Sequence, residues 1–166
     1  MEPSFLLADL DGFTPHISRL VCMMTYVRYT TLEAVKGMSQ TNLDARVLET
    51  GNSVGMLLSH MAEVEQFYQA NTFGGEYTYR EGPSILSDYG RKHCQGNNLE
   101  HYLNVLAESR ERTLTEFSQR DDTWLHEAKP FGKTGRLTNN YFKWFHVFED
   151  EINHRGQIRL IRKLLQ

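Results

Sequence analysis

Three side chains that could bind a metal or exchange a proton recur near the C-terminus, in the stretch HVFEDEINH. They are His146, Asp150 and His154, each four residues from the next. Residues four apart stack along one side of a helix, so a helix here would bring two imidazoles and a carboxylate together. Such a row could be a solvated helix face, a buried hydrogen-bonded ladder or part of a metal site.

A metal site in a helical protein usually takes a further ligand from a neighbouring helix. The segment LLSHMAEVEQFY supplies a candidate, His60, at the edge of an apolar helical face. Glu63 follows three residues later, and Glu65 falls on the apolar face itself. A histidine in this position is also common as a hydrogen-bonded core residue. Spacing alone therefore leaves both a metal site and a polar network open.

Four long helices are expected to position these groups, because apolar residues recur every three or four residues over four segments. The segments cover residues 13–36, 53–70, 98–117 and 139–166. The expected N-caps of the last three are Asn52 or Ser53, Asn97 or Asn98, and Thr138 or Asn139. This pattern predicts an all-α four-helix bundle, formed by a single domain over residues 1–166.

The connections between these helices are expected to be irregular. Residues 38–53 are polar and predict a loop, whereas a short helical piece is expected over residues 84–93. Pro130 and two glycines exclude a continuous helix after the third segment, so we expect a brief hairpin at about 124–137.

The last helix is expected to bury two different faces. Its first half carries an arc made by Tyr141, Phe142, Phe145, Phe148 and Ile152. Arginine and lysine occupy the same arc in the second half, where the apolar residues move to the opposite side: Ile158, Ile161, Leu164 and Leu165. The aromatic arc exceeds what one small bundle needs, and it could pack on another helix or on a second subunit.

Asp150, His154 and Gln157 fall on the second of these faces, with His146 at its edge. The row is therefore expected to point into the bundle. Burying a carboxylate without partners costs several kcal/mol unless a cation or hydrogen-bond donors meet it. A satisfied polar network and a bound metal remain as the two interpretations.

Composition excludes several classes of function. The 166 residues carry a formal charge of −3 and no long basic run, so nucleic acid is not an expected partner. No apolar stretch approaches the roughly 20 residues needed to cross a bilayer, and no secretory signal is evident. Cys22 and Cys94 form no CxxC motif and are expected to be reduced thiols. These features together predict a cytoplasmic protein without a membrane partner.

Two stretches, GNSVGMLLSHMAEVEQFY and WFHVFEDEINHRGQIRLIRKLL, resemble the DinB/YfiT-like superfamily of bacterial proteins described as metal-dependent. TLEAVKGMSQTNLDAR also resembles the family's link between its first two helices, and only the middle of the chain is uncharacteristic. The resemblance implies a bundle of up-down-down-up topology, often a homodimer. It also implies a divalent metal, most often Zn or Ni, held by one His of the second helix and two of the last.

Carried over to this chain, the metal ligands are His60, Asp150 and His154. The family commonly has His where Asp150 stands, and Asn153 also replaces a family His, so the site could bind metal weakly, bind a different metal or bind none. His146, Asn153 and Gln157 are expected to support the ligands from behind, and His146 could orient Asp150. No catalytic residue is singled out.

Members of the superfamily include transferases that use a low-molecular-weight thiol such as bacillithiol or mycothiol. The resemblance therefore implies a metal-dependent thiol-S-transferase acting on small electrophiles. A stress-related bundle that binds a metal or a small molecule without turnover is the alternative. A metal-assisted hydrolase, with Glu63 or Glu65 as general base, is a third interpretation.

Overall fold

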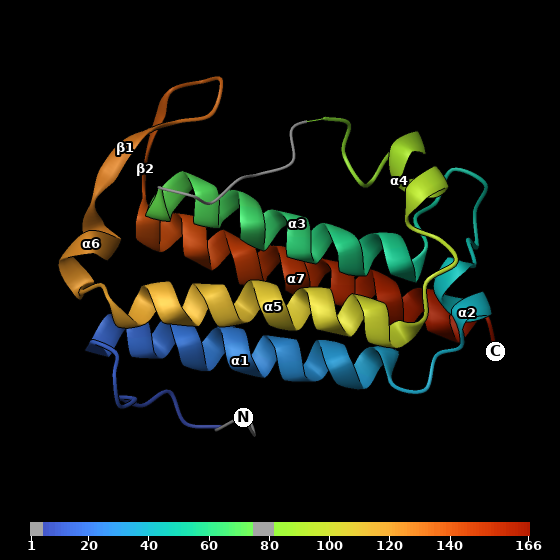
Figure 1. Cartoon of the computed structure of the whole chain (residues 1–166), viewed down its shortest axis with the longest axis horizontal. Coiled ribbons are helices and arrows are strands. Elements are labelled where there is room, and N and C mark those ends of the chain that lie inside the picture. The colour runs from blue at the N-terminus through green and yellow to red at the C-terminus, as the bar shows by residue number, and fades with distance from the viewer. Residues whose placement is uncertain (1–4, 75–81) are drawn as a thin grey trace.

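Four long helices lie side by side in the computed structural model, which describes residues 5–74 and 82–166 (Figure 1). They are α1 (Pro15–Val35), α3 (Val54–Phe73), α5 (Leu99–Ser118) and α7 (Asn140–Leu164). Figure 1 shows α1 and α7 running in one direction and α3 and α5 in the other. α3 packs on both α5 and α7, and α1 packs mainly on α7. The predicted up-down-down-up four-helix bundle is confirmed.

Three of the long helices begin where the sequence predicts. Ser53, Asn98 and Asn139 each accept a hydrogen bond from the backbone N–H three residues further on, at 2.8–3.2 Å. Each such bond satisfies one of the N–H groups that the first turn of a helix leaves without a partner. α3 extends three residues beyond the predicted end, to Phe73.

Short elements connect the long helices. They are α2 (Gln40–Asp44), α4 (Asp88–His93), α6 (Asp122–His126), β1 (Ala128–Phe131) and β2 (Arg136–Asn139). The predicted hairpin is confirmed as an antiparallel pair in which Ala128 faces Asn139. The loop prediction for residues 38–53 is wrong in part, because Ser39 caps the short helix α2 there. α6 was not predicted either, and its Asp122 accepts the backbone N–H of His16 at the start of α1.

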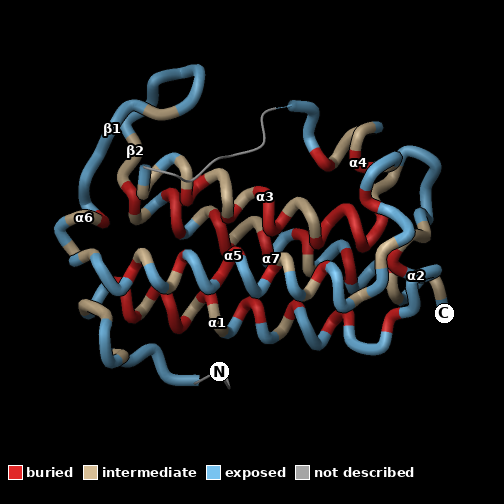
Figure 2. The backbone as a smooth tube through the Cα atoms, in the orientation of Figure 1, coloured by how far each residue is buried: buried red, intermediate tan, exposed pale blue. Residues whose placement is uncertain are grey.

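Two large apolar clusters lie at opposite ends of the bundle, and a third, smaller one is formed by Met56, Ile85 and Cys94. The buried positions line the inside of the bundle (Figure 2). One large cluster includes Leu57, Leu106 and Ile158, and the other includes Phe117 and Trp144. Between the two large clusters lies a layer of four buried charged residues, one from each long helix: Arg28, Glu65, Arg110 and Glu151. We call these four residues the ionic layer.

Every charge of the ionic layer has a counter-charge within reach. Arg28 Nε donates to Glu151 Oε1 at 2.9 Å, and Arg110 Nε donates to Glu65 Oε1 at 2.8 Å. Arg28 also donates to Glu65 Oε2 at 3.2 Å, which joins the two pairs. Burial raises the pKa of Glu65, but Arg110 and Arg28 outweigh it and hold that pKa below its usual value. Buried charges persist when they are paired in this way.

The last helix buries one continuous face, and the prediction of two faces is wrong. Its buried residues follow helical spacing along the whole length: Lys143, Trp144, Val147, Phe148, Glu151, His154, Ile158 and Ile161. Within the predicted aromatic arc Phe148 is buried, but Phe142 and Phe145 are exposed. Leu164 is exposed as well. Lys143 and Glu151 conceal the stripe in the sequence, because charged residues ordinarily mark a solvated face.

Candidate metal centre

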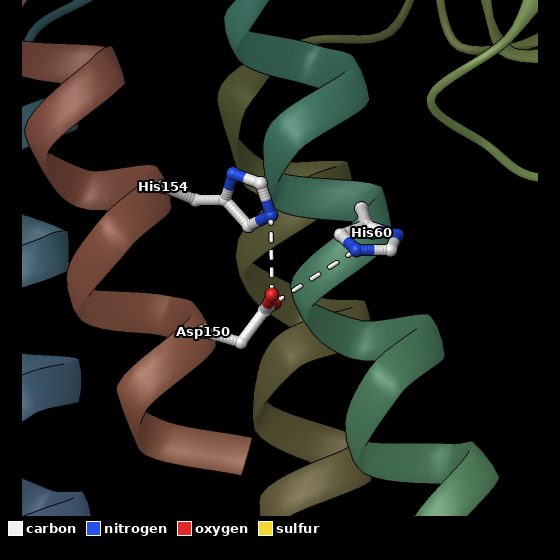
Figure 3. Close-up of side chains that lie close together, drawn as sticks. All are labelled: His60, Asp150 and His154. Carbon is white, nitrogen blue, oxygen red and sulfur yellow. Dashed lines mark ion pairs between the residues drawn. The ribbon is translucent and has the colours of Figure 1, made fainter. Parts of the chain in front are cut away.

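His60, Asp150 and His154 meet between the second and the last long helix (Figure 3). His154 Nε2 lies 3.4 Å from Asp150 Oδ1, and His60 Nε2 lies 3.8 Å from Asp150 Oδ2. The two imidazole rings are nearly perpendicular, with centroids 5.0 Å apart. One ligand atom from each residue lies within 4.8 Å of the others. We call these three residues the triad.

The carboxylate of Asp150 is the centre of this arrangement. Burial raises its pKa, but contact with His154 and the charges of His154, His60 and His146 outweigh burial and lower it. Burial lowers the pKa of His154, but Asp150, Gln157 and Glu149 together outweigh burial, so that pKa lies above its usual value. The pKa of His60 is lowered, because burial dominates there. Asp150 is thus held as an anion between two imidazoles.

Each imidazole of the triad has a side-chain oxygen near its other ring nitrogen, but only the one at His154 has hydrogen-bond geometry. Glu63 Oε2 lies 3.5 Å from His60 Nδ1, and Gln157 Oε1 lies 3.3 Å from His154 Nδ1. An acceptor at Nδ1 favours the tautomer that leaves Nε2 free to bind a metal. Gln157 was expected to support the ligands, whereas the place of Glu63 behind His60 was not foreseen. The i,i+3 spacing of His60 and Glu63 on one helix could have indicated it.

The other two predicted supporting residues lie further out. His146 Nδ1 is 2.9 Å from Glu149 Oε2, and the amide of Asn153 donates to the other oxygen of Glu149. The ring of His146 also stands 6.0 Å from that of Tyr68. His146 therefore faces the triad from the side and acts on Asp150 through its charge.

The residues of the triad fit a divalent metal. Two nitrogens and one carboxylate oxygen are a common ligand set for Zn and related metals, and they leave further positions open. Ligands bound at about 2.1 Å are separated by about 3–4 Å around one metal, which is close to the two separations from Asp150. Asp150 Oδ2 and His60 Nδ1 are buried and lack a hydrogen-bond partner among residues 5–74 and 82–166. A cation between the ligands would satisfy the carboxylate oxygen.

A cavity of about 290 Å³ opens beside the triad. His60, Glu63 and Asp150 form one side of it, and the remaining lining residues are Val64, Phe67, Tyr68 and His146. Phe67 and Tyr68 were not connected with the site in the sequence, because aromatic residues at helical spacing usually indicate core. Glu65, considered above as a general base, is fully buried in the ionic layer and does not reach this cavity.

The fold and the site together define a class of protein: an up-down-down-up four-helix bundle with a His–Asp–His cluster between its second and last long helices. The comparison with protein-family models identifies the family. The model described as Mycothiol-S-transferase matches residues 19–166, so the chain belongs to this family. The family is part of the DinB/YfiT-like superfamily, which confirms the resemblance. A search of curated proteins finds no match.

Membership implies a thiol-S-transferase-like function with mycothiol, a low-molecular-weight thiol. A conjugating enzyme of this kind acts on small molecules, in agreement with the small cavity beside the triad. Within the part of the chain that the structure describes, no helix is both long and apolar enough to span a bilayer.

Proposed function

We propose that this protein is a metal-dependent transferase that joins mycothiol to small electrophiles, with His60, Asp150 and His154 as the metal ligands. The observation that carries the proposal is the convergence of these three side chains within 4.8 Å in a chain of the mycothiol-S-transferase family. Zn and Ni are the metals we expect, since imidazole and carboxylate ligands suit both.

The residues around the triad have separate tasks in this proposal. A divalent metal bound there would take up the thiol sulfur and lower its pKa, which produces a stronger nucleophile at neutral pH. Gln157 orients the imidazole of His154, Glu63 lies beside the imidazole of His60, and Asp150 supplies negative charge. The cavity beside the triad leaves room for the second substrate.

Metal content tests the proposal first. Untagged protein should contain close to one metal per chain by mass spectrometry, and His60→Ala and His154→Ala should lose it. His93→Ala, which changes an exposed histidine of α4, is the matched control and should keep the metal. Conjugation of mycothiol to a fluorogenic chlorobimane should follow the metal content. Protein that takes up neither Zn, Ni nor Mn on reconstitution would contradict metal dependence.

A non-catalytic bundle that binds a metal or a small molecule is the second candidate. The observation that favours it is the pairing inside the triad, where Asp150 already serves as counter-charge to His154 at 3.4 Å. If the triad is only a polar network, Asp150→Ala should lower stability in chelator-treated and untreated protein alike. If the triad holds a metal, Asp150→Ala should lower stability fully only in the untreated protein, because the chelator-treated wild type has already lost the metal.

We further propose that the protein is a homodimer. Supporting this, Phe142, Phe145 and Ile152 form an exposed apolar row on α7, and Ile152 shares a hollow with Tyr26 of α1. This hollow of about 370 Å³ opens between the N-terminal segment, α1 and α7, and is lined mainly by apolar side chains. Contiguous exposed apolar surface of this kind commonly marks a protein–protein contact.

A further inference from the structure

The cavity beside the triad has an aromatic wall made by Phe67, Tyr68 and His146, and Phe131 packs against the first two without lining the cavity. Phe67 and Tyr68 come from α3, and their rings lie 6.1 and 5.9 Å from the ring of Phe131 on β1. His146 of α7 stands edge-on to Tyr68, with ring planes at 89°. Lys143 Nζ lies 5.1 Å from the centroid of the Phe131 ring.

This wall offers a flat apolar ligand both a surface and edges. Aromatic rings associate by offset stacking or edge-to-face contact at centroid separations of roughly 4.5–7 Å, as the wall residues already do among themselves. The cavity of about 290 Å³ is at the small end of ligand-binding cavities. It suits one small ring system better than an extended chain.

Tyr68 combines a buried ring with an available hydroxyl. Its side chain is largely buried, and its hydroxyl has no hydrogen-bond partner in the described part of the chain. The charge of Asp150 acts on this hydroxyl, which places it within electrostatic reach of the triad. A phenol near neutral pH donates one hydrogen bond. Tyr68 can therefore donate to an oxygen of a ligand that occupies the cavity.

We propose that the cavity selects aryl-substituted α,β-unsaturated carbonyl compounds, and that Tyr68 donates a hydrogen bond to their carbonyl oxygen during thiol addition. This inference rests on the proposed function of the triad. The thiol sulfur forms a bond to the β-carbon, the electron pair of the carbon–carbon π bond forms a new π bond between the α-carbon and the carbonyl carbon, and the carbonyl π pair moves onto the oxygen. The thiol proton leaves to water, and the α-carbon later takes a proton from water. The reaction is an addition without a leaving group or a redox step.

Two electrophiles that share the same reacting group test the selection. The probes are 4-phenyl-3-buten-2-one, which carries an aromatic ring, and 3-penten-2-one, which does not. Wild-type protein loaded with metal should show the lower KM for the aryl ketone. Phe67→Leu keeps an apolar side chain of similar size, and it should raise KM for the aryl ketone by about two- to tenfold while changing the aliphatic ketone little.

The Tyr68 hydroxyl is tested by Tyr68→Phe, which removes one oxygen atom. The variant should lower kcat on both ketones by about tenfold to a hundredfold, because both form the same oxyanion. KM and metal content should stay as in wild type. Tyr141→Phe makes the same chemical change outside the cavity, where Tyr141 packs against His16 and His126, and should leave kcat unchanged. Equal kcat in wild type and Tyr68→Phe would overturn the assignment of Tyr68.

A binding measurement separates this inference from the proposed function. The saturated ketone 4-phenyl-2-butanone cannot react, and its dissociation constant can be measured by calorimetry. Wild type should bind it, and Phe67→Leu should bind it about two- to tenfold more weakly. If the protein conjugates chlorobimane yet binds this ketone no better than 2-pentanone, the selection is overturned and the proposed function stands. If no electrophile is conjugated, the proposed function fails, and the ketone still decides whether the cavity selects aryl groups.

Discussion

The two imidazoles of the candidate metal centre are held in different ways, and the difference has consequences for binding. His154 is oriented by Gln157 at one nitrogen and meets Asp150 at the other. Glu63 Oε2 lies 3.5 Å from His60 Nδ1, but the two atoms do not have the geometry of a hydrogen bond. Gln157 is exposed, so it contributes little to the core and its contact with His154 can be removed without a cavity.

Gln157→Ala should therefore weaken metal binding without destabilising the fold. Loss of a group that orients a ligand typically costs about 10–100-fold in metal affinity. The measurement is competition for Zn against a chelating dye, together with thermal unfolding of the metal-free protein. Asn153→Ala is the matched control, because Asn153 lies on the same helix but donates to Glu149. Equal losses of affinity in the two variants would contradict the assigned role of Gln157.

At the scale of the elements, the ionic layer holds the helices that carry the triad. Glu65 lies five residues after His60 on α3, and Glu151 directly follows Asp150 on α7. Through Arg28, these two glutamates are tied to one guanidinium. We infer that the layer sets the rotation of α3 and α7 at which the ligands of the triad face one another.

Replacing one member of the ionic layer should lower the free energy of unfolding more than replacing all four members. Arg28→Met leaves two buried carboxylates with one arginine, and breaking a buried pair typically costs about 3–5 kcal/mol. Replacing all four with Met and Leu removes every buried charge and should be neutral or stabilising. Urea unfolding gives both values. A fourfold variant less stable than Arg28→Met would show that the layer contributes more than desolvation costs.

The lowered pKa of Glu65 predicts how stability depends on pH. A carboxyl whose folded-state pKa is below its unfolded value stabilises the fold above the unfolded value and loses that contribution as the pH falls. The contribution of Glu65 should thus be complete above about pH 4.5, its usual pKa, and decline below it. Unfolding free energies of wild type between pH 3 and 7 should show this fall. Glu65→Gln should flatten it, with the exposed Glu100→Gln as control; an unchanged slope in Glu65→Gln would contradict the prediction.

The sequence predicted the elements better than it predicted the faces they bury. Capping residues and apolar spacing are local, so the first residues of α3, α5 and α7 followed from Ser53, Asn98 and Asn139. The ionic layer depends on four helices at once, and only Glu65 was noticed on an apolar face. Arg28, Arg110 and Glu151 resemble ordinary solvated charges until their counter-charges are known. Four-residue spacing predicted that Asp150 and His154 lie together, but it also indicated His146, which lies outside the triad. The family resemblance was needed to choose His60 as the third residue.

At the scale of the whole molecule, one face of the bundle carries a row of exposed apolar side chains on α7. The exposed fractions of Phe142, Phe145 and Ile152 are 56%, 43% and 39%. The buried face of α7, which carries His154 and Ile158, lies on another side of the same helix. An interface centred on Phe145 and Ile152 would therefore lie away from the triad, whereas Phe142, which stacks on His146, would bring it to the edge of the cavity.

The proposed homodimer leads to a prediction that keeps assembly separate from metal binding. Sedimentation at micromolar concentration should give twice the 19.3 kDa mass of one chain. A Phe145→Ser/Ile152→Ser variant should sediment as a monomer, because it removes apolar area that only a partner would cover. Leu137→Ser is the control, since Leu137 is an exposed apolar residue of the hairpin, and it should remain dimeric. The double variant should keep its metal, because neither side chain contacts the triad. Wild type that sediments as a monomer would refute the dimer, and the apolar row would then be a surface for a different partner.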